Sequence, residues 1–525
     1  MSTLHSIFET HSKYNDKPAL ITPQSCLVPT TLSYQQLYGV IQDFSVKLAG
    51  VIPSGSLSPG QSVSIAYPNS LEFVVAFLGC GLMRLVASPL NPAYTKDEFL
   101  FYLEDAKSTV IIVPPGSIKN NYAAVLAAQE RRGIHVVEMV WDGKDIQLFT
   151  PHTHAASTVQ PVTFHPQPQD VALLLHTSGT TGRPKGVPLT HLNLVTSMKN
   201  IVKTYELSPQ DRTLLVMPLF HVHGLICGLL STLLSGGSAV IPQKFSASHF
   251  WNDFKDNGCN WYTAVPTIHQ ILLRNPPSQV PTIRFIRSCS SSLAPSTFHA
   301  IEQKFKAPVL EAYAMTEASH QMTSNPLPKN GAHKPGSVGL GQGVEVAILN
   351  DQGQPVEEGE ICIRGSNVTK GYLNNPKATA ESFTDDGYFR TGDQGKKDED
   401  GYVVLTGRIK ELINRGGEKI SPLEVDAILL SHPNVAEVVT FGVPDPMYGQ
   451  DIHAAVVLKS SAAPAKDVEK ELQTYVHTKA AKFKVPKRIY VTDHLPKTGT
   501  GKIQRRKMVD VFFKPKSATA PQAKL

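Results

Sequence analysis

Cysteine is scarce in this chain, and it never stands in the spacing of a metal or redox site. The six cysteines among 525 residues are scattered, with no C-x-x-C pair and no regular interval. Zinc sites and disulfide frameworks depend on such intervals. We therefore expect isolated thiols in a reducing compartment, and we exclude a disulfide scaffold and a zinc site.

Long hydrophobic runs are missing as well. Two uncharged apolar segments, residues 73–83 and 225–234, fall well short of the roughly 20 residues that cross a bilayer. Residues 1–16 are polar and lack the charged and apolar regions of a secretory leader. We expect both apolar segments to be core elements, and we expect neither a membrane span nor an export signal.

Neither sign of charge dominates the chain. The formal net charge is +6, the isoelectric point is about 8.8, and charged residues make up 18% against 41% hydrophobic ones. These values are ordinary for a soluble globular protein. A mild and diffuse positive charge argues against nucleic acid as a partner and suits small anionic substrates. At this length we expect more than one domain, each with a substantial core.

A loop at residues 177–186 concentrates glycine, hydroxyl groups and two cations. Glycine allows close backbone approach, while hydroxyls and turned-in amides donate to phosphate oxygens. The loop follows an expected buried strand, Val171–Leu175, and α/β sheets place ligands at strand ends. Its spacing is neither the G-x-x-x-x-G-K-[ST] loop nor the G-x-G-x-x-G turn. Rather than a plain solvated turn, we predict a phosphate grip made by Thr177, Ser178, Gly179, Thr180, Thr181, Gly182 and Lys185.

Short apolar runs between helical stretches predict a mixed α/β chain. A Pro- and His-rich linker, residues 150–169, precedes the phosphate loop, and glycine-punctuated alternation over residues 344–405 predicts a small β subdomain. A compact α/β module begins near residue 411. Further strands are expected at residues 62–66, 110–113, 136–140, 239–241, 285–286, 435–442 and 454–458, and helices at 422–431 and 467–479.

Four further motifs carry chemistry. Residues 311–317 place an aromatic, a hydroxyl and a carboxylate within five positions, which suits a base, a phosphate and Mg²⁺. Residues 388–393 end in a carboxylate suited to ribose hydroxyls, residues 407–420 combine cations with a Gly-Gly turn, and residues 496–502 form a second glycine loop ending in lysine. Each motif alone is more often a surface turn, but the four in this order are specific.

On these motifs the chain resembles the adenylate-forming superfamily of acyl-CoA synthetases, firefly luciferase and peptide-synthetase adenylation domains, over essentially all of its length. The resemblance implies an α/β fold with a large N-terminal domain, residues 1–409, made of two α/β subdomains and a β subdomain. A small mobile α+β C-terminal domain, residues 410–515, would follow. It also implies an AMP-forming acid–thiol ligase that uses ATP, Mg²⁺ and coenzyme A and passes through an acyl-adenylate.

The same resemblance assigns the nucleotide contacts. The residue 177–185 loop would hold the β- and γ-phosphates, Thr316 the α-phosphate, and Glu317 the Mg²⁺ ion. Tyr313 would lie along the adenine, Asp393 would bind the ribose hydroxyls, and Arg408 the ribose or a phosphate.

The C-terminal motifs take roles in the two half-reactions. Lys502 would bridge the substrate carboxylate and the α-phosphate during adenylation. The C-terminal domain would then rotate about Lys410 and bring Gly416 and Gly417 to the pantetheine channel. Glycine suits this place because the backbone must approach a narrow thiol arm.

The acyl pocket departs from that of relatives that act on fatty or aromatic acids. Where they have Ser-Gly-Ala-Ala-Pro-Leu, residues 288–293 read Ser-Cys-Ser-Ser-Ser-Leu, and residues 318–320 read Ala-Ser-His in place of small apolar residues. A polar wall forfeits about 0.8 kcal/mol per buried CH₂ of a fatty chain, whereas a second carboxylate needs donors. We therefore expect a small, doubly charged acid.

Within the superfamily the chain resembles the oxalate–CoA ligases of plants and fungi, over residues 261–270, 311–320 and 408–425. This resemblance implies that oxalate, ATP and CoA give oxalyl-CoA, AMP and pyrophosphate, the first step of oxalate catabolism. The alternatives are a medium-chain fatty or aryl acid–CoA ligase and a basic RNA-binding or scaffold protein with an inactive synthetase fold. The candidates for the distal carboxylate are Ser290, Ser291, His223 and His320, with His221 lining the acyl site and joining Lys502, Thr316 and Glu317 in the catalytic set.

The last ten residues, 516–525, read as a flexible tail ending in Ala523-Lys524-Leu525. This order of small, basic and Leu residues resembles the Ser-Lys-Leu peroxisomal address. We predict a peroxisomal import receptor as a partner and a peroxisomal location, with the cytoplasm as the alternative.

Overall fold

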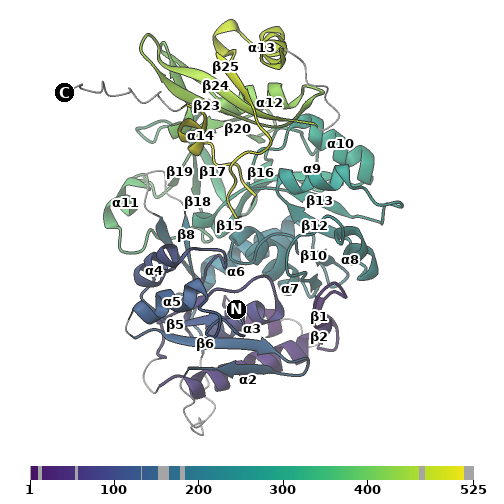
Figure 1. Cartoon of the computed structure of the whole chain (residues 1–525), viewed down its shortest axis with the longest axis vertical. Coiled ribbons are helices and arrows are strands. Elements are labelled where there is room, and N and C mark those ends of the chain that lie inside the picture. The colour runs from purple at the N-terminus through teal and green to yellow at the C-terminus, as the bar shows by residue number, and fades with distance from the viewer. Residues whose placement is uncertain are drawn as a thin grey trace, which may run out of the picture. The chain divides into compact units, whose positions relative to one another are not determined.

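The computed structural model describes residues 2–9, 15–53, 57–131, 133–151, 165–177, 184–459, 467–499 and 501–513 (Figure 1). The chain divides into two compact units. The first comprises Met1–Ser291, Ala300–Ala347 and Cys362–Thr391, and the second Ser292–His299, Ile348–Ile361 and Gly392–Leu525. None of the described helices combines the length and the apolar composition needed to cross a bilayer.

A seven-stranded sheet lies in the first unit. Its inner strands are parallel and its two edge strands antiparallel. Three inner strands are buried almost throughout, as expected where helices cover both faces of a parallel sheet. The strand order is β7 (Ile146–Phe149), β6 (His135–Trp141), β5 (Ser108–Val113), β3 (Ser62–Ile65), β4 (Val86–Pro89), β8 (Val171–Thr177) and β9 (Lys185–Thr190).

A nine-stranded sheet completes the strands of the first unit that position the site. It is parallel from β14 through β1 and antiparallel at both ends. Its order is β16 (Leu340–Gly341), β15 (His320–Ser324), β14 (Val309–Met315), β13 (Phe285–Ser288), β12 (Trp261–Ala264), β10 (Arg212–Leu214), β11 (Ser238–Val240), β1 (Pro18–Thr22) and β2 (Thr30–Ser33).

Three helices of this part of the chain begin at hydroxyl groups that form capping boxes. Ser33, Thr95 and Thr190 each accept from the third helical residue and form a capping box. The helices of this part of the chain are α1 (Ser6–Glu9), α2 (Tyr34–Val51), α3 (Leu71–Leu82), α4 (Lys96–Asp105), α5 (Ala123–Glu130), α6 (His191–Tyr205), the π-helix η2 (His223–Leu230), α7 (Ser231–Leu234), α8 (Phe250–Asp256), α9 (Pro266–Arg274), α10 (Pro295–Phe305), the 3₁₀ turn η3 (Thr316–Ala318) and α11 (Pro376–Glu381).

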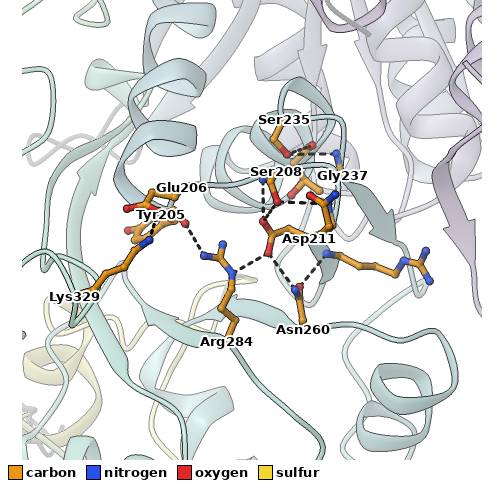
Figure 2. Close-up of polar contacts among 12 residues, drawn as sticks. Tyr205, Glu206, Ser208, Asp211, Ser235, Gly237, Asn260, Arg284 and Lys329 are labelled. Atoms are coloured by element: carbon orange, nitrogen blue, oxygen red, sulfur yellow. Dashed lines mark hydrogen bonds and ion pairs between the residues drawn. The ribbon is translucent and has the colours of Figure 1, made fainter. Parts of the chain in front are cut away.

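A polar network around Asp211 fixes the amino ends of three neighbouring strands (Figure 2). The buried Asp211 carboxylate accepts from the Ser208 amide at 2.8 Å and the Asn260 side chain at 3.1 Å, and it pairs with Arg284 at 2.8 Å. Arg284 also donates to the carbonyl of Tyr205 at 2.9 Å. These groups lie at the starts of β10, β12 and β13, so the network links the amino ends of three strands of this sheet.

Four strands, β17 (Glu345–Leu349), β18 (Glu358–Arg364), β19 (Phe389–Lys397) and β20 (Val403–Arg408), form a third sheet in that order. β19 and β20 are antiparallel and place Asp393 directly opposite Arg408. The glycine-rich alternation of this region therefore does form β structure.

The second unit contains a five-stranded sheet with apolar cores on both faces (Figure 1). Successive side chains of a strand point to opposite faces, so Val438 and Val439 enter different cores. α12 (Pro422–Leu430) and α13 (Val468–Lys479) pack in one core, and α14 (Lys507–Phe512) in the other. The order is β22 (Glu418–Ile420), β21 (Ile413–Arg415), β24 (Gly449–Leu458) and β23 (Val435–Asp445), with β25 (Arg488–Val491) beside β24 and the 3₁₀ turns η4 (Ile409–Glu411) and η5 (Lys482–Lys484) in the loops.

The secondary-structure predictions agree with these elements. Every expected strand overlaps an observed one, and the two expected C-terminal helices are α12 and α13. Residues 73–83 lie in the buried helix α3 and its cap, and residues 225–234 lie in η2 and α7, so both are core elements as predicted. All six cysteines are free thiols, five of them buried. Residues 152–164 of the expected linker lie outside the described residues.

Candidate active site

The carboxyl ends of parallel strands collect the predicted site residues of the first unit. β8 ends at Thr177, β12 at Ala264, β13 at Ser288 and β14 at Met315, and open α/β sheets bind ligands at such ends. Thr177 pairs across the strands with Lys185, so the phosphate loop is the connection between β8 and β9. The predicted contacts Ser178, Gly179, Thr180, Thr181 and Gly182 lie outside the described residues.

One tyrosine links the phosphate loop to the predicted magnesium ligand. The ammonium of Lys185 lies 4.4 Å from the centre of the Tyr372 ring, and the Tyr372 hydroxyl donates to Glu317 Oε1 at 2.9 Å. Burial, and next the Glu317 carboxylate, raise the pKa of Tyr372, so its phenol stays a donor. The structure thus places Lys185 over the face of the Tyr372 ring and Glu317 at its hydroxyl, an arrangement that the sequence motifs do not predict.

Glu317 is held on the turn η3, directly after β14 and beside Thr316. Its side chain is buried, and its carbonyl accepts from the Thr369 amide at 2.7 Å. Among the described residues no group of three or more His, Cys, Asp or Glu side chains could hold a metal ion. A single carboxylate suits Mg²⁺, which commonly takes one or two carboxylates together with substrate phosphates, so Glu317 fits the ion predicted from the sequence.

A buried polar cluster lies where the acyl pocket is predicted. His223 is fully buried; its Nδ1 lies 3.1 Å from Ser290 Oγ and its Nε2 lies 2.6 Å from Thr263 Oγ1. The His320 ring stacks on that of His223 with centroids 5.2 Å apart. Three of the four residues predicted for the distal carboxylate, His223, Ser290 and His320, therefore form one group.

His320 is the residue of this cluster whose polar atoms most need a ligand. It is fully buried, and neither ring nitrogen has a hydrogen-bond partner among the residues that the structure describes. Burial first, and the Arg287 cation second, hold the pKa of His320 and of His223 well below the ordinary value, so both imidazoles are neutral. A buried polar group without a partner costs about 1–3 kcal/mol, which a ligand with hydrogen-bonding groups would recover.

Ser291, His221 and Tyr313 stand in different positions. Ser291 is exposed, and its hydroxyl donates to the Ser290 carbonyl at 2.8 Å, so it does not join the cluster. His221 Nδ1 accepts the backbone N–H of His223 at 3.2 Å, which places it one step from the cluster. Tyr313 is buried in β14, opposite Thr323 of β15.

Arg287 is a site residue that the motifs do not predict. It is fully buried in β13, directly opposite Thr263 of β12. The sequence predicts that this strand ends at Ile286, whereas the observed strand continues through Arg287 to Ser288. The signal that could have identified Arg287 is a charged residue directly after an apolar pair, because arginine is almost never fully buried unless it is paired.

The second unit gathers the remaining predicted residues. Arg408 Nε donates to Asp393 Oδ1 at 2.8 Å. Partial removal from water, and next the Arg408 cation, lower the pKa of Lys502, whose side chain keeps exposed surface. Lys410 is exposed in the turn η4, between β20 and β21.

The Gly-Gly turn connects β21 to β22. Gly416 and Gly417 have φ values of 59° and 94°, the left-handed region that favours glycine. The Gly416 amide donates to the Tyr448 carbonyl at 2.9 Å, which fixes the turn against the loop between β23 and β24.

Comparisons with known proteins agree with these observations. Residues 7–373 match the model of the AMP-binding enzyme family, and residues 424–502 match that of the AMP-binding enzyme C-terminal domain. The chain is 48% identical to a Saccharomyces cerevisiae protein named oxalate–CoA ligase, with 98% of each chain covered. It is also 48% identical to an Arabidopsis thaliana protein of that name, over 97% of this chain and 99% of the other.

A solved structure supports the fold. The crystal structure of ATP-bound MatB from Rhodopseudomonas palustris is 29% identical, covers 97% of this chain and 99% of its own, and superposes with a TM-score of 0.85. The predicted adenylate-forming fold and enzyme class are thereby confirmed. The chain therefore belongs to the AMP-binding enzyme family.

Proposed function

We propose that this chain is an ATP-dependent oxalate–CoA ligase, which converts oxalate, ATP and coenzyme A to oxalyl-CoA, AMP and pyrophosphate. The observation that supports this substrate is the buried cluster of His223, Ser290 and His320, in which both ring nitrogens of His320 lack a partner within the described part of the chain. Such a cluster suits a second carboxylate and not a fatty chain. The similarity to two relatives named oxalate–CoA ligase supports the same substrate.

Adenylation brings an attacking carboxylate up to a polyanion, so the protein must position the reactants and neutralise charge. Lys185 and the rest of the phosphate loop would bind the β- and γ-phosphates, and Thr316 the α-phosphate. Glu317 would hold Mg²⁺, which screens the phosphate charge when bound. In the first half-reaction, in which a carboxylate oxygen attacks the α-phosphorus and pyrophosphate leaves, Lys502 would bridge the carboxylate and the α-phosphate oxygens.

The remaining residues would hold the nucleoside and the thiol. Tyr313 would lie along adenine, while Asp393 and Arg408 would bind the ribose. In the second half-reaction the domain of residues 410–515 would turn about Lys410 relative to residues 1–409. The turn at Gly416 and Gly417 would then line the pantetheine channel, where its lack of side chains leaves room.

A panel of acids tests this function. CoA-dependent AMP release is measured with oxalate, malonate, octanoate and coumarate at equal concentration. We expect turnover with oxalate and little with the other three. Preferred turnover of octanoate or coumarate would overturn the substrate, and AMP release from no acid would overturn the reaction.

The tail extends the proposal to the cell. Ala523-Lys524-Leu525 would address the enzyme to peroxisomes, where it would begin oxalate catabolism; this tripeptide lies outside the described residues. A fluorescent protein fused ahead of residues 514–525 should enter peroxisomes. The same fusion with Leu525 deleted should stay in the cytoplasm, and identical distributions would contradict the address.

A further inference from the structure

Arg287 is a buried cation that has no counter-ion among the residues that the structure describes. Its side chain is fully buried in β13, and it forms no ion pair with any described residue. No Asp or Glu occurs at the positions outside the described residues either. An uncompensated buried charge is costly, so its retention here calls for an anion that the chain itself does not provide.

Three neutral oxygens surround the guanidinium. Nε donates to the Tyr205 hydroxyl at 2.6 Å, while Nη1 and Nη2 donate to Thr263 Oγ1 and Gln321 Oε1, each at 3.3 Å. These contacts fix the orientation of the group but do not offset its charge. The contrast with Arg284 is direct, because Arg284 pairs with the Asp211 carboxylate (Figure 2).

The contact to Thr263 begins a chain of hydrogen bonds that reaches the acyl pocket. Arginine can only donate, so Thr263 Oγ1 accepts from it and is free to donate its own proton to His223 Nε2 at 2.6 Å. A neutral imidazole carries one proton, which then lies on Nδ1 and donates to Ser290 Oγ at 3.1 Å. The Ser290 hydroxyl proton is left to donate to a ligand.

We propose that Arg287 is the positioning residue that orients this series of hydrogen bonds and supplies the positive charge that selects a dianionic acid. Arg287 acts through Thr263 and His223 on Ser290, which would touch the distal carboxylate. The inference rests on the proposed function, because it concerns the acid bound in the same pocket. His320 lies beside His223, and no described residue bonds to either of its ring nitrogens; this is the second observation that points to a ligand there.

Charge selection is tested with oxalate and its isosteric monoanion oxamate, whose amide replaces one carboxylate. We expect Arg287→Met to lower the oxalate-to-oxamate ratio of kcat/KM about tenfold to a hundredfold, the range of a charge-assisted hydrogen bond. KM for ATP should change less than about twofold, and Arg287→Lys should recover the ratio. Arg284→Met, the same change at the paired arginine, should leave the ratio unaltered.

The donor direction of the hydrogen bonds from Thr263 through His223 to Ser290 is tested separately, by the tautomer of His223. Nitrogen-15 NMR of histidine-labelled protein, with His223 assigned by a His223→Gln variant, should show the Nδ1–H tautomer in the wild type. Thr263→Val keeps the Arg287 charge but removes the link, so the tautomer should change to Nε2–H. This variant also tests the inference if Arg287→Met fails to fold.

The outcomes separate the two proposals. A wild-type enzyme without oxalate turnover would refute the proposed function, while the tautomer measurement still tests the chain. Oxalate turnover with an unchanged oxalate-to-oxamate ratio in Arg287→Met would refute the role of Arg287 alone. An Nε2–H tautomer of His223 in the wild type would refute the proposed donor direction of these hydrogen bonds.

Discussion

The rings of His223 and His320 stack with centroids 5.2 Å apart and planes inclined by 24°. Two imidazoles this close cannot both be cationic without repulsion, and the Arg287 cation also disfavours the charged form of each. Both rings are therefore neutral, with the nitrogens of His223 bonded to Ser290 and Thr263.

His320→Ala should raise the KM for oxalate about tenfold or more, since it removes hydrogen-bonding groups that only a ligand can satisfy. KM for ATP should stay within about twofold. Steady-state kinetics with each substrate varied in turn make the comparison. His249→Ala, at an exposed histidine, serves as the matched control, and an unchanged oxalate KM in His320→Ala would refute its role.

Tyr372→Phe should raise the Mg²⁺ concentration needed for half-maximal rate about tenfold or more, because groups that orient a metal ligand commonly contribute that much. The variant removes the hydrogen bond to Glu317 but keeps the ring beneath Lys185. Mg²⁺ titration of pyrophosphate release measures the effect. Tyr475→Phe, which removes a hydroxyl from α13 in the second unit, should leave the titration unchanged.

Lys502→Ala should reduce ATP–pyrophosphate exchange by roughly 10²–10³, the usual loss for a preorganised donor. Thioester formation from supplied acyl-adenylate should be largely retained. Lys497→Ala, in the same loop but paired with Glu437, is the control and should affect neither half-reaction. Equal loss of both half-reactions in Lys502→Ala would assign the lysine a structural role instead.

The free energy of unfolding should decrease as the pH falls from about 6.5 to about 4. Burial lowers the pKa of His191 and of His269 to about 4, so in this window the unfolded chain binds protons that the folded chain does not. Each such histidine contributes a slope of about 1.4 kcal/mol per pH unit. Above pH 6.5 this stabilisation is fully present.

Denaturant unfolding at several pH values measures that slope. His191→Gln should reduce the slope by about 1.4 kcal/mol per pH unit, the contribution of one histidine. His477→Gln, at an exposed position of α13, should leave the slope as in the wild type. A wild-type stability that is constant between pH 7 and 5 would contradict the prediction.

The sequence predicts strands such as β5 and β8 because buried strands of a parallel sheet read as continuous apolar runs, here Val110–Val113 and Val171–Leu175. It does not predict the π-helix η2, because an apolar run such as residues 225–234 reads alike in any buried helix. Composition therefore predicts that this segment is buried. It does not predict whether the backbone forms the i→i+4 hydrogen bonds of an α-helix or the i→i+5 bonds of a π-helix.

The site follows the same division. Local motifs identify Glu317 and Lys185, because each stands in a short pattern with its own chemistry. The contact between His223 and Ser290 joins residues 67 positions apart, and Tyr372 lies 55 positions from Glu317. Only the strand order brings such pairs together, so Tyr372 and Arg287 are visible in the structure and not in the motifs.

Ser290 and His320 both have left-handed backbones, with φ values of 73° and 94°. In mutagenesis libraries that retarget the acyl pocket, codons for glycine, asparagine and aspartate should therefore be enriched among functional clones at these two sites. Valine, isoleucine and threonine should be depleted, although threonine is the usual conservative exchange for serine. The evolvability of this pocket is thus constrained by main-chain torsion before any side chain meets a substrate.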